Sequence, residues 1–407
     1  MTERFDAVVI GAGIVGLATA RALAVRHRLR IVVVEAEQRV AFHQTGHNSG
    51  VVHSGLYYRP GSVKATHCAR GREALYRYCA EHGVAHERCG KLVVAVSAAE
   101  LPRLDELARR GQANGLAGIR RLDPGEMRER EPHVEGVAGL LVPETGIVDY
   151  VGVAGAMAAE VAAQGGEVRL GWPCMAVRRL AGEIVVETPR GAVRADGLVN
   201  CAGLQSDRVA RLCGVDPGVR IVPFRGDYYV LAEARRSLVR HLIYPVPDPE
   251  LPFLGVHFTR RIDGSVEAGP NAVLAWKREG YGRSDFSLPD AWSTLSFPGI
   301  WRMAPGYARI GWQEYRRAWS RRLFVASLRR LIPEIAPDDV RPGGAGVRAQ
   351  ALDRSGRLLD DFHLVDAERM VHVLNAPSPA ATAALAIGET VAARAVARFD
   401  RAAAGAA

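Results

Sequence analysis

The chain has 407 residues, of which 48% are hydrophobic and 24% charged. This balance is ordinary for a globular protein and excludes a disordered or fibrous chain, and the length allows two intertwined domains at the usual domain size of roughly 100–200 residues. The formal net charge is +9, but the basic residues are scattered in pairs such as Arg109-Arg110, and no run of five like charges marks a nucleic-acid arm. We therefore expect no nucleic-acid partner, and the positive charge favours a small anionic substrate.

The cysteines and the apolar segments place further limits on the class of protein. The six cysteines show neither a C-x-x-C pair nor zinc-ligand spacing, so we expect reduced thiols in a cytoplasmic protein and no metal site. The apolar run 7–20 follows Glu3 and Asp6 and contains three glycines, which does not fit a signal peptide, and no stretch reaches the roughly 18 apolar residues of a transmembrane helix. A basic patch could meet the anionic inner face of a membrane, but no amphipathic anchor is evident, so we expect peripheral contact at most.

The first elements predict a βαβ unit. Residues 5–10 predict a buried strand, residues 17–25 a helix, and residues 30–34 a second apolar strand that ends at Glu35. The turn between the first strand and the helix has glycines at positions 11, 13 and 16. Glycines at this spacing permit a tight turn, a close approach of the backbone to a pyrophosphate, and close packing of the helix on the strand.

This turn predicts a dinucleotide site. The N-terminus of the helix faces the phosphates, whose negative charge its unpaired N–H groups and dipole favour. Glu35 lies nineteen residues beyond Gly16 at a strand end, where a carboxylate can accept hydrogen bonds from a ribose. The strand, the helix and the acidic residue all stand in the order that the motif requires.

The next part of the first half mixes loops and longer elements. Residues 38–60 are rich in Gly, Ser, His and Asn and predict an ordered loop near the ligand. An amphipathic helix is expected at 62–81, then a strand at 91–96 and a helix at 98–114. The segment 123–149 mixes Pro, Gly and charge and is expected to cross between domains.

The middle of the chain alternates short strands and turns after an Ala-rich helix at 152–164. The short strands are expected at 167–170, 176–180, 183–188 and 191–195, with a buried strand at 197–200. A second, antiparallel sheet whose wall faces the ligand is expected from 221–232, 253–259 and 266–268. Helices follow within 318–331, and a last strand at 370–374 leads through the loop 375–379 into a long Ala-rich helix that ends near residue 402.

Two later segments favour FAD over NAD. Residues 198–203 resemble the strand and small-residue turn that return to the pyrophosphate in two-domain flavoproteins. The closing strand, loop and helix at 371–387 resemble the element whose helix N-terminus points at the flavin pyrimidine and stabilises negative charge on the reduced ring. Three separate nucleotide-facing segments are hard to explain for NAD alone.

Motifs along nearly the whole chain resemble one family. They lie at 47–58, 60–65, 223–229, 254–259, 269–272, 278–281, 346–350, 360–362 and 375–382. Together they resemble the L-2-hydroxyglutarate oxidase/dehydrogenase group within the D-amino-acid-oxidase-like FAD proteins, and the sequences HNSG at 47–50 and NAPSP at 375–379 are the most specific. Asp227, where Glu is more usual, and Ser54, where a small apolar residue is common, are minor departures.

The resemblance implies an α/β fold in which a Rossmann-like FAD-binding domain is interleaved with an α+β substrate domain built on an antiparallel sheet. The FAD-binding domain is expected at 1–80, 145–220 and 340–407, and the substrate domain at 81–144 and 221–339. We expect non-covalent FAD, because nothing local demands a covalent bond from His43, His47 or a cysteine. The residues expected to bind FAD are Gly11, Gly13, Ile14, Val15, Gly16, Glu35, Ala36, Thr45, Asn48, Ser49, Gly50, Val177, Cys201, Ala202, Gly203, Arg348, Asn375, Ser378, Ala380, Ala381 and Thr382.

The activity that the resemblance implies is oxidation of a 2-hydroxy acid, with L-2-hydroxyglutarate as the leading substrate and oxygen or a membrane quinone as the electron acceptor. Removing a hydride from C2 to flavin N5 needs a base for the hydroxyl proton, and a neutral imidazole is the natural candidate. His257, on an expected strand of the substrate sheet, is favoured as this base, and His53, in the loop beside the flavin, is the second candidate.

The remaining site candidates would hold the substrate. A guanidinium can grip a carboxylate by two hydrogen bonds, and arginines stand in motif segments at positions 225, 260 and 348. Lysine is scarce, so Lys64 and Lys277 stand out. The residues expected to bind the substrate are Tyr57, Arg225, Tyr244, Lys277 and Arg348, and Tyr58 and Tyr228 could also shape an aromatic wall.

Two other functions stay open. The first is an oxidase on the same scaffold that acts on an amine, an amino acid or a sugar-derived alcohol in a biosynthetic pathway. The second is an FAD-containing nucleic-acid-modifying protein, which predicts retention on RNA or DNA that falls steeply with salt. The dispersed arginines argue against the second function.

Overall fold

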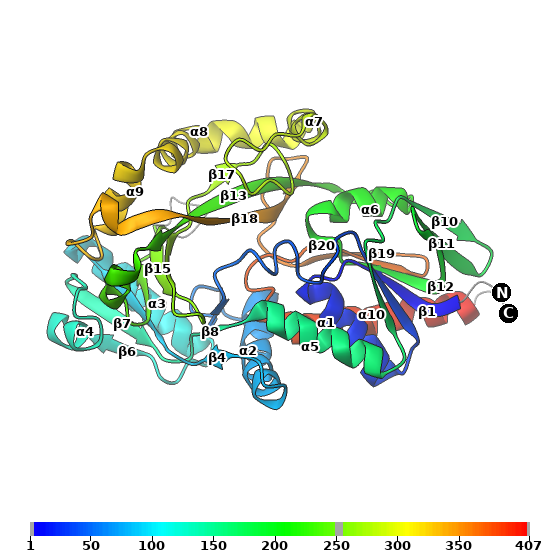
Figure 1. Cartoon of the computed structure of the whole chain (residues 1–407), viewed down its shortest axis with the longest axis horizontal. Helices are drawn as coiled ribbons and strands as arrows, with labels where there is room; N and C mark the ends of the chain where they lie inside the picture. The colour runs from blue at the N-terminus through cyan, green and yellow to red at the C-terminus, as the bar shows by residue number, and fades with distance from the viewer. Residues whose placement is uncertain (1–3, 249–254, 405–407) are drawn as a thin grey trace.

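A computed structural model describes residues 4–248 and 255–404 of the chain, with side chains up to residue 399. Two large sheets lie side by side (Figure 1). The first has eight strands in the order β10-β11-β12-β1-β2-β9, and β20 pairs with both β12 and β19. Its strands are β1 (Arg4–Ile10), β2 (Ile31–Glu35), β9 (Glu167–Leu170), β10 (Ala176–Leu180), β11 (Glu183–Thr188), β12 (Gly191–Asn200), β19 (His363–Ala367) and β20 (Met370–Asn375).

The second sheet has nine strands in the order β17-β13-β16-β15-β14-β5-β7-β6, and β18 pairs with β13. Its described pairs are antiparallel except that β14 runs parallel to β5. The strands are β5 (Lys91–Ala95), β6 (Arg120–Leu122), β7 (Ala138–Val142), β13 (Val219–Leu231), β14 (Leu242–Pro245), β15 (His257–Arg260), β16 (Val266–Gly269), β17 (Val273–Leu274) and β18 (Val340–Asp353). A small third sheet joins β3 (Val51–Val52), β8 (Gly146–Val148) and β4 (His86–Glu87).

Helices around the eight-stranded sheet enclose its core. They are α1 (Ile14–His27), α2 (Val63–Glu81), α5 (Tyr150–Ala163), α6 (Ser206–Leu212) and α10 (Ala384–Ala404). The helix α1 packs against both α5 and α10. A Cβ added to Gly388 would lie 2.5 Å from the carbonyl carbon of Ala18, so the two helices approach this closely only because α10 carries glycine there.

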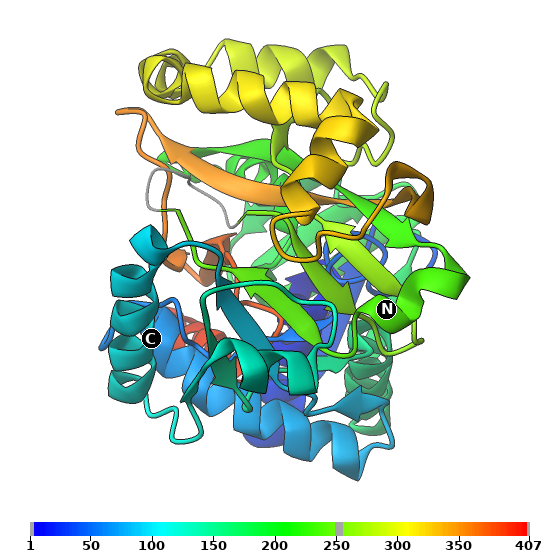
Figure 2. The ribbon, with the colours of Figure 1, turned by 90° about the vertical axis from the view of Figure 1, so that its left-hand side faces the viewer.

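The nine-stranded sheet carries helices in two groups. The helices α3 (Leu101–Ala113) and α4 (Pro124–Arg130) flank the strands β6 and β7 (Figure 1). The helices α7 (Leu288–Leu295), α8 (Pro298–Trp319) and α9 (Arg321–Leu328) form an outer layer over β13, β17 and β18 (Figure 2). Short 3-10 helices lie at Ala98–Glu100, Gly203–Gln205, Glu233–Leu238 and Pro337–Asp339.

Most of the expected elements are present, and their bounds differ by a few residues. The expected strands 191–195 and 197–200 are one continuous strand, β12, and the first part of the expected strand 253–259 lies outside the described residues. The segment 123–149, which is expected to cross between domains, contains α4, β7 and β8. All six cysteines are free thiols.

Two long elements were missed. The strand β18 contains Pro342, Gly343 and Gly344, a composition typical of a turn, but it forms a long antiparallel ladder with β13, and this pairing overrides local propensity. The helix α8 contains Pro305 in its interior and was hidden by its prolines and glycines. Because β18 belongs to the nine-stranded sheet, we propose that the last segment of the FAD-binding domain begins after Asp353 rather than at residue 340.

Candidate active site

The glycine turn lies where the carboxyl ends of three parallel strands, β1, β2 and β12, meet. The N–H of Gly11 donates to the carbonyl of Val34 at 2.8 Å, and the N–H of Cys201 donates to the carbonyl of Ile10 at 2.9 Å. Gly11 has φ of +103°, and a Cβ there would lie 2.6 Å from the carbonyl oxygen of Cys201. This position therefore accepts only glycine, and the expected convergence of these nucleotide segments is present in the fold.

Two side chains fasten this turn. Glu35, at the end of β2, accepts the N–H of Ala12 at 2.6 Å through Oε2 and the N–H of Glu37 at 3.0 Å through Oε1. The hydroxyl of Thr45 accepts the N–H of Ile14 at 2.9 Å. These contacts hold the predicted ribose acceptor and the loop 38–60 directly beside the start of α1.

The start of α1 has the donors that a pyrophosphate needs. Val15 and Gly16 lie in the first turn, where backbone N–H groups have no intrahelical partner. A Cβ added to Gly13 would meet only the hydroxyl of Thr45, at 3.5 Å, so the approach to the turn is open at that residue. Such helix termini bind anions through these N–H groups and the helix dipole.

Some of the other expected FAD-binding residues lie close to this turn, and others lie further from it. Asn48 donates to the carbonyls of Gln44 and Thr45 and accepts the N–H of Gly50 at 2.8 Å, which fixes the loop. Ala202 and Gly203 lie just after Cys201, the residue that follows β12. Ser49 is half-buried beside Gly50, Ala36 is exposed directly after β2, and Val177 lies on β10, two strands from β12.

The closing segment lies against the loop that carries His53. The hydroxyl of Thr382 accepts the N–H of His53 at 3.0 Å and lies 3.0 Å from the Tyr150 hydroxyl. Ser378 hydrogen-bonds Tyr58. The expected residues Ala380 and Ala381 stand between these contacts in the turns that precede α10.

Asn375, at the end of β20, supplies a buried acceptor. Its side-chain N–H groups donate to the carbonyls of Leu359 and Asp361 at 3.0 and 2.8 Å. Its Oδ1 has no hydrogen-bond partner among the described residues, and a buried oxygen of this kind is expected to meet a donor. Together with the glycine turn and the open helix N-terminus, this oxygen fits a bound FAD.

Lys91, which no sequence motif marked as a site residue, is the centre of a second group. It lies on β5 and is 1% exposed. Its Nζ lies 4.3 Å from the ring centroid of Tyr57 and 4.9 Å from that of Tyr244, and it donates to the Tyr57 hydroxyl at 3.3 Å. Burial lowers the pKa of Lys91 to about 7. Lysine scarcity was the usable signal, but it directed attention to Lys64 and Lys277 instead.

The two predicted base candidates both belong to this group. Burial lowers the pKa of His257 to about 4, and the nearby charges of Lys91 and Arg348 act in the same direction. Burial, Lys91 and His257 lower the pKa of His53 to about 3. The His257 ring stacks on Tyr244 with centroids 3.9 Å apart. Both imidazoles are therefore neutral at pH 7 and able to accept a proton.

A hydrogen bond orients His257. Its Nδ1 lies 2.9 Å from the carbonyl oxygen of Gly255, and because that oxygen only accepts, Nδ1 carries the proton. The lone pair is then on Nε2.

Of the three arginines in motif segments, Arg260 pairs with Glu87, and Arg225 and Arg348 lie on opposite faces of the nine-stranded sheet. Arg348 on β18 pairs with Phe224 on β13, and a Cβ on Gly226 would lie 3.1 Å from its Nη1. Arg225 points to the other face, because successive side chains alternate along a strand. Arg348 therefore shares the face of Tyr228, to which it is electrostatically coupled, and of the histidine and lysine group.

Arg225 is occupied by a buried ion pair. Its Nε donates to Asp227 at 2.8 Å and its Nη1 to the carbonyl of Gly282 at 2.5 Å. Both partners of the pair are less than a tenth exposed. Lys277 is exposed in the loop after β17, and Lys64 binds Asp360 at 2.7 Å. The contacts therefore do not bring Arg225 or Lys277 to the group around Lys91.

His43 and His47 have other partners. His43 Nδ1 lies 2.9 Å from the Tyr281 hydroxyl and its Nε2 lies 3.1 Å from Glu37, and the His47 ring stacks on Tyr281 at 3.9 Å. Ligand atoms of Glu37, His43 and Glu279 lie within 4.8 Å of one another. The hydrogen bonds of this cluster account for it without an ion.

Comparison with known proteins identifies the family. A family model described as "FAD dependent oxidoreductase" matches residues 6–394. The chain belongs to this family of FAD-dependent oxidoreductases, as the glycine turn and the closing segment indicated. The predicted fold class, the cofactor and the enzyme class are thereby confirmed.

Within this family, the chain is similar to several proteins that share one name. The chain is 48% identical to L-2-hydroxyglutarate dehydrogenase of Indibacter alkaliphilus, over 97% of this chain and 100% of the relative. It is 45% identical to the human mitochondrial L-2-hydroxyglutarate dehydrogenase, over 98% of this chain and 90% of the relative. It is 44% identical to that of Escherichia coli K12, over 94% of this chain and 91% of the relative. The family resemblance of the motifs is confirmed.

Solved structures share the fold. L-alpha-glycerophosphate oxidase from Mycoplasma pneumoniae with FAD bound superposes with a TM-score of 0.79 at 21% identity, over 97% of this chain and 95% of that chain. Glycine oxidase from Geobacillus kaustophilus superposes with a TM-score of 0.70 at 16% identity, over 98% and 95% of the two chains.

Proposed function

We propose that this enzyme oxidises L-2-hydroxyglutarate to 2-oxoglutarate. The observation that carries the proposal is the buried group in which the neutral imidazoles of His53 and His257 stand beside the basic side chains of Lys91 and Arg348. The relatives named L-2-hydroxyglutarate dehydrogenase support the choice of substrate. FAD, when bound, accepts the hydride that leaves C2 of the substrate.

His257 is the proposed base for the C2 hydroxyl proton. Its Nδ1 is committed to the Gly255 carbonyl, so Nε2 is free to accept the proton while the hydride leaves. The imidazolium that forms would keep its Nδ1 hydrogen bond, which favours the protonated state. His53 is the second candidate.

Lys91 and Arg348 would hold the two carboxylates of the substrate. A buried cation interacts strongly with a carboxylate because water does not screen the pair. A pKa of about 7 leaves Lys91 partly neutral at pH 7, and a nearby carboxylate would raise that pKa. Substrate binding is therefore expected to take up a proton. Tyr57 and Tyr244 would keep Lys91 in position through their rings and the Tyr57 hydroxyl.

The flavin-binding residues are proposed in two sets. The first, supported by contacts at the glycine turn, comprises Gly11, Gly13, Ile14, Val15, Gly16, Glu35, Thr45, Cys201, Ala202 and Gly203. The second, near the catalytic group, comprises Asn48, Ser49, Gly50, Arg348, Asn375, Ser378, Ala380, Ala381 and Thr382. Oxygen and a membrane quinone both stay as candidate electron acceptors.

Anaerobic mixing tests the substrate. The purified flavoprotein should lose its flavin absorbance with L-2-hydroxyglutarate and keep it with D-2-hydroxyglutarate, with amines and with sugar-derived alcohols. Re-admitting oxygen then measures how fast oxygen reoxidises the reduced flavin. A quinone analogue added in place of oxygen measures reoxidation by the other candidate acceptor. Bleaching by an amine or sugar alcohol and not by L-2-hydroxyglutarate would overturn the proposal in favour of the other oxidase.

A further inference from the structure

A cavity of about 200 Å³ lies where the start of β13, the end of β18 and the start of α8 meet. Three arginines from different segments line it: Arg211 on α6, Arg220 on β13 and Arg354 in the turn after β18. Asp216 is the acidic residue among the lining residues, and its Oδ1 accepts the N–H of Gly218 at 3.0 Å. The lining of the cavity therefore carries an excess of positive charge.

The guanidinium of Arg220 has a donor without an acceptor. Its Nη1 donates to the carbonyl and hydroxyl oxygens of Ser293 on α7, each at 2.8 Å, and the group lies over the Phe297 ring, 5.2 Å from its centroid. These partners are neutral. The Nε is buried and has no hydrogen-bond partner among the described residues, although a buried donor is expected to meet an acceptor.

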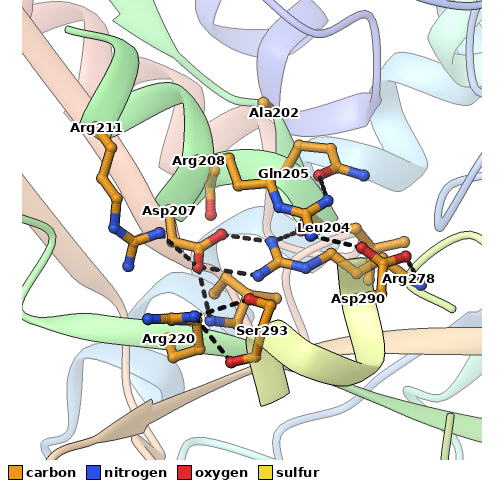
Figure 3. A network of polar contacts seen from close by, with 12 residues as sticks. Ala202, Leu204, Gln205, Asp207, Arg208, Arg211, Arg220, Arg278, Asp290 and Ser293 are labelled. Atoms are coloured by element: carbon orange, nitrogen blue, oxygen red, sulfur yellow. Dashed lines mark hydrogen bonds and ion pairs between the residues drawn. The ribbon is translucent and has the colours of Figure 1, made fainter. Parts of the chain in front are cut away.

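The neighbours of Arg220 do not compensate its charge, because four arginines share two carboxylates in this network (Figure 3). The arginines are Arg208, Arg211, Arg220 and Arg278, and the carboxylates are those of Asp207 and Asp290. Asp290 pairs with Arg208 at 2.5 Å, while Asp207 pairs with the buried Arg278 and also with Arg211. Burial lowers the pKa of Arg220, and the charge of Arg211 acts in the same direction. Two of the four positive charges therefore have no carboxylate of their own.

The start of α8 brings a helix N-terminus to the same cavity. Phe297 and Pro298 line the cavity, and Phe297, the residue before the helix, makes no capping hydrogen bond with its side chain. A Cβ added to Gly299 would overlap the carbonyl oxygen of Asp353, so α8 begins this close to the end of β18 only because glycine stands there. The N–H groups of a first helical turn and the helix dipole favour a negative charge.

The cavity is separate from the substrate group. Across β13 and β18, Arg220 pairs with Leu352, whereas Arg348 pairs with Phe224. Four residues of extended strand between positions 220 and 224 span about 13 Å. An anion in the cavity would therefore not compete with a substrate carboxylate at Arg348.

The size of the cavity and the arrangement of its donors select the class of anion. The volume of about 200 Å³ is below the roughly 300–1,000 Å³ of sites that hold drug-sized ligands, so a small ion fits and a nucleotide does not. The donors come from α6, β13, α8 and the turn after β18. A tetrahedral oxyanion directs its oxygens toward several sides, whereas a carboxylate directs its two oxygens within one plane. Guanidinium groups bind phosphate oxygens through paired hydrogen bonds.

We propose that this cavity binds a small tetrahedral oxyanion with two negative charges, for which inorganic phosphate is the probe. The Nε of Arg220 would donate to the anion, and Arg211 and Arg354, which are both exposed, would close on it from the solvent side. The two negative charges would offset the two positive charges that lack a carboxylate. This inference goes beyond the proposed reaction and does not depend on the identity of the substrate.

A bound anion would also stabilise the network beside the nucleotide turn. Arg278, which pairs with Asp207, donates to the carbonyl of Leu204 at 2.7 Å. Leu204 lies two residues after Ala202, at the expected pyrophosphate site. The cavity is therefore connected to the FAD-binding segment through buried polar contacts rather than through the substrate group.

Titration calorimetry of the FAD-loaded enzyme with inorganic phosphate tests the proposal. FAD fills its own pyrophosphate site, chloride keeps the ionic strength constant, and a pH of about 8 keeps phosphate doubly charged. One phosphate should bind per chain. Sulfate, which is also tetrahedral and doubly charged, should compete with phosphate, whereas acetate should not.

Arginine variants locate the bound phosphate. Arg354→Gln should weaken binding by about tenfold or more, because one charged hydrogen-bond donor is lost. Arg220→Gln should weaken it further, but this variant also loses the contacts with Ser293, so Arg354→Gln is the decisive variant. Arg341→Gln is the matched control: it removes an exposed arginine at the other end of β18 and should bind phosphate like the wild type.

A variant of the substrate group separates the two possible anion sites. Lys91→Met should bind phosphate as tightly as the wild type, because Lys91 lies outside the cavity. The proposal is overturned if the wild type binds no phosphate, if Arg354→Gln and Arg341→Gln bind it equally well, or if Lys91→Met loses the binding. Competition by acetate as strong as that by sulfate would also overturn the assigned class of anion.

Discussion

The two ends of the active site work by different means. At the nucleotide end the backbone supplies the function: glycines without side chains, N–H groups of a first helical turn, and a carboxylate that accepts two backbone N–H groups. At the substrate end the function resides in buried titratable side chains, whose pKa values burial shifts toward the neutral forms. The first end is fixed by steric exclusion, whereas the second retains charge-bearing groups at a cost in stability.

The largest effect is expected at the nucleotide end. A side chain at Gly11 would clash with the carbonyl of Cys201, and the backbone there has a positive φ that valine rarely adopts. Gly11→Val should therefore abolish FAD binding. Purified protein should be colourless by absorbance. Gly155→Ala on α5 is the matched control, because nothing lies within 4 Å of a Cβ there. Normal flavin content in Gly11→Val would contradict the steric account.

The next effect concerns the base at the substrate end. His257→Gln should lower the rate of flavin reduction by about 10²–10⁴, the usual contribution of a general base, while FAD content stays normal. His53→Gln, measured in parallel, should have a smaller effect. The reverse order would assign the base to His53.

The pH dependence of the wild type follows from the same group. Because the pKa of His257 is lowered to about 4, the imidazole stays a base well below its ordinary range. The rate of flavin reduction at saturating substrate should remain flat from pH 7 to about pH 5 and fall only as the base is protonated near its pKa. A fall centred near pH 6.5 would show an unshifted imidazole.

A pair of arginine variants separates the two faces of β13. Arg348→Met should raise KM for L-2-hydroxyglutarate by about 10–100-fold, since a charged hydrogen bond to a carboxylate is lost. Arg225→Met should leave KM nearly unchanged and instead lower stability by about 3–5 kcal/mol, because Asp227 becomes an unpaired buried charge. Steady-state kinetics and thermal unfolding together distinguish these results. A large KM effect from Arg225→Met would place that guanidinium at the substrate.

The smallest effect, and the most specific to this comparison, is a gain in stability. The pKa of Lys91 is lowered by burial to about 7, so the native protein disfavours the charge that the unfolded chain carries below pH 10.5. Stability from this group is lost as pH falls from 10.5 to about 7 and is constant below that. At pH 7, Lys91→Met should therefore be more stable than the wild type while losing activity. Thermal unfolding of the substrate-free enzyme checks the sign, and a loss of stability would contradict it.

The nucleotide end could be predicted from the sequence because its signals are local. The glycines, the first strand and Glu35 lie within the first 35 residues, and their spacing alone specifies the geometry. The sequence motifs also indicated the family and, through it, the α/β fold class. The histidine candidates followed from chemistry and motif context, and both lie beside Lys91.

The substrate end could be predicted only in part because its contacts join strands that are distant in sequence. Lys91 meets Tyr244 only because β5 pairs in parallel with β14, and this pairing has no local signal. Arg225 and Arg348 looked equivalent until the register of β13 and β18 placed them on opposite faces. The helix α8 was missed because Pro305 and several glycines weaken its helical pattern.

Stopped-flow flavin reduction by L-2-hydroxyglutarate deuterated at C2 tests the central claim most directly. The substrate end is proposed to deprotonate the hydroxyl while the C2 hydride leaves, so deuterium should slow anaerobic reduction of the wild type, and His257→Gln should slow it much further. If L-2-hydroxyglutarate leaves the flavin of a fully loaded enzyme oxidised, the proposed reaction is contradicted.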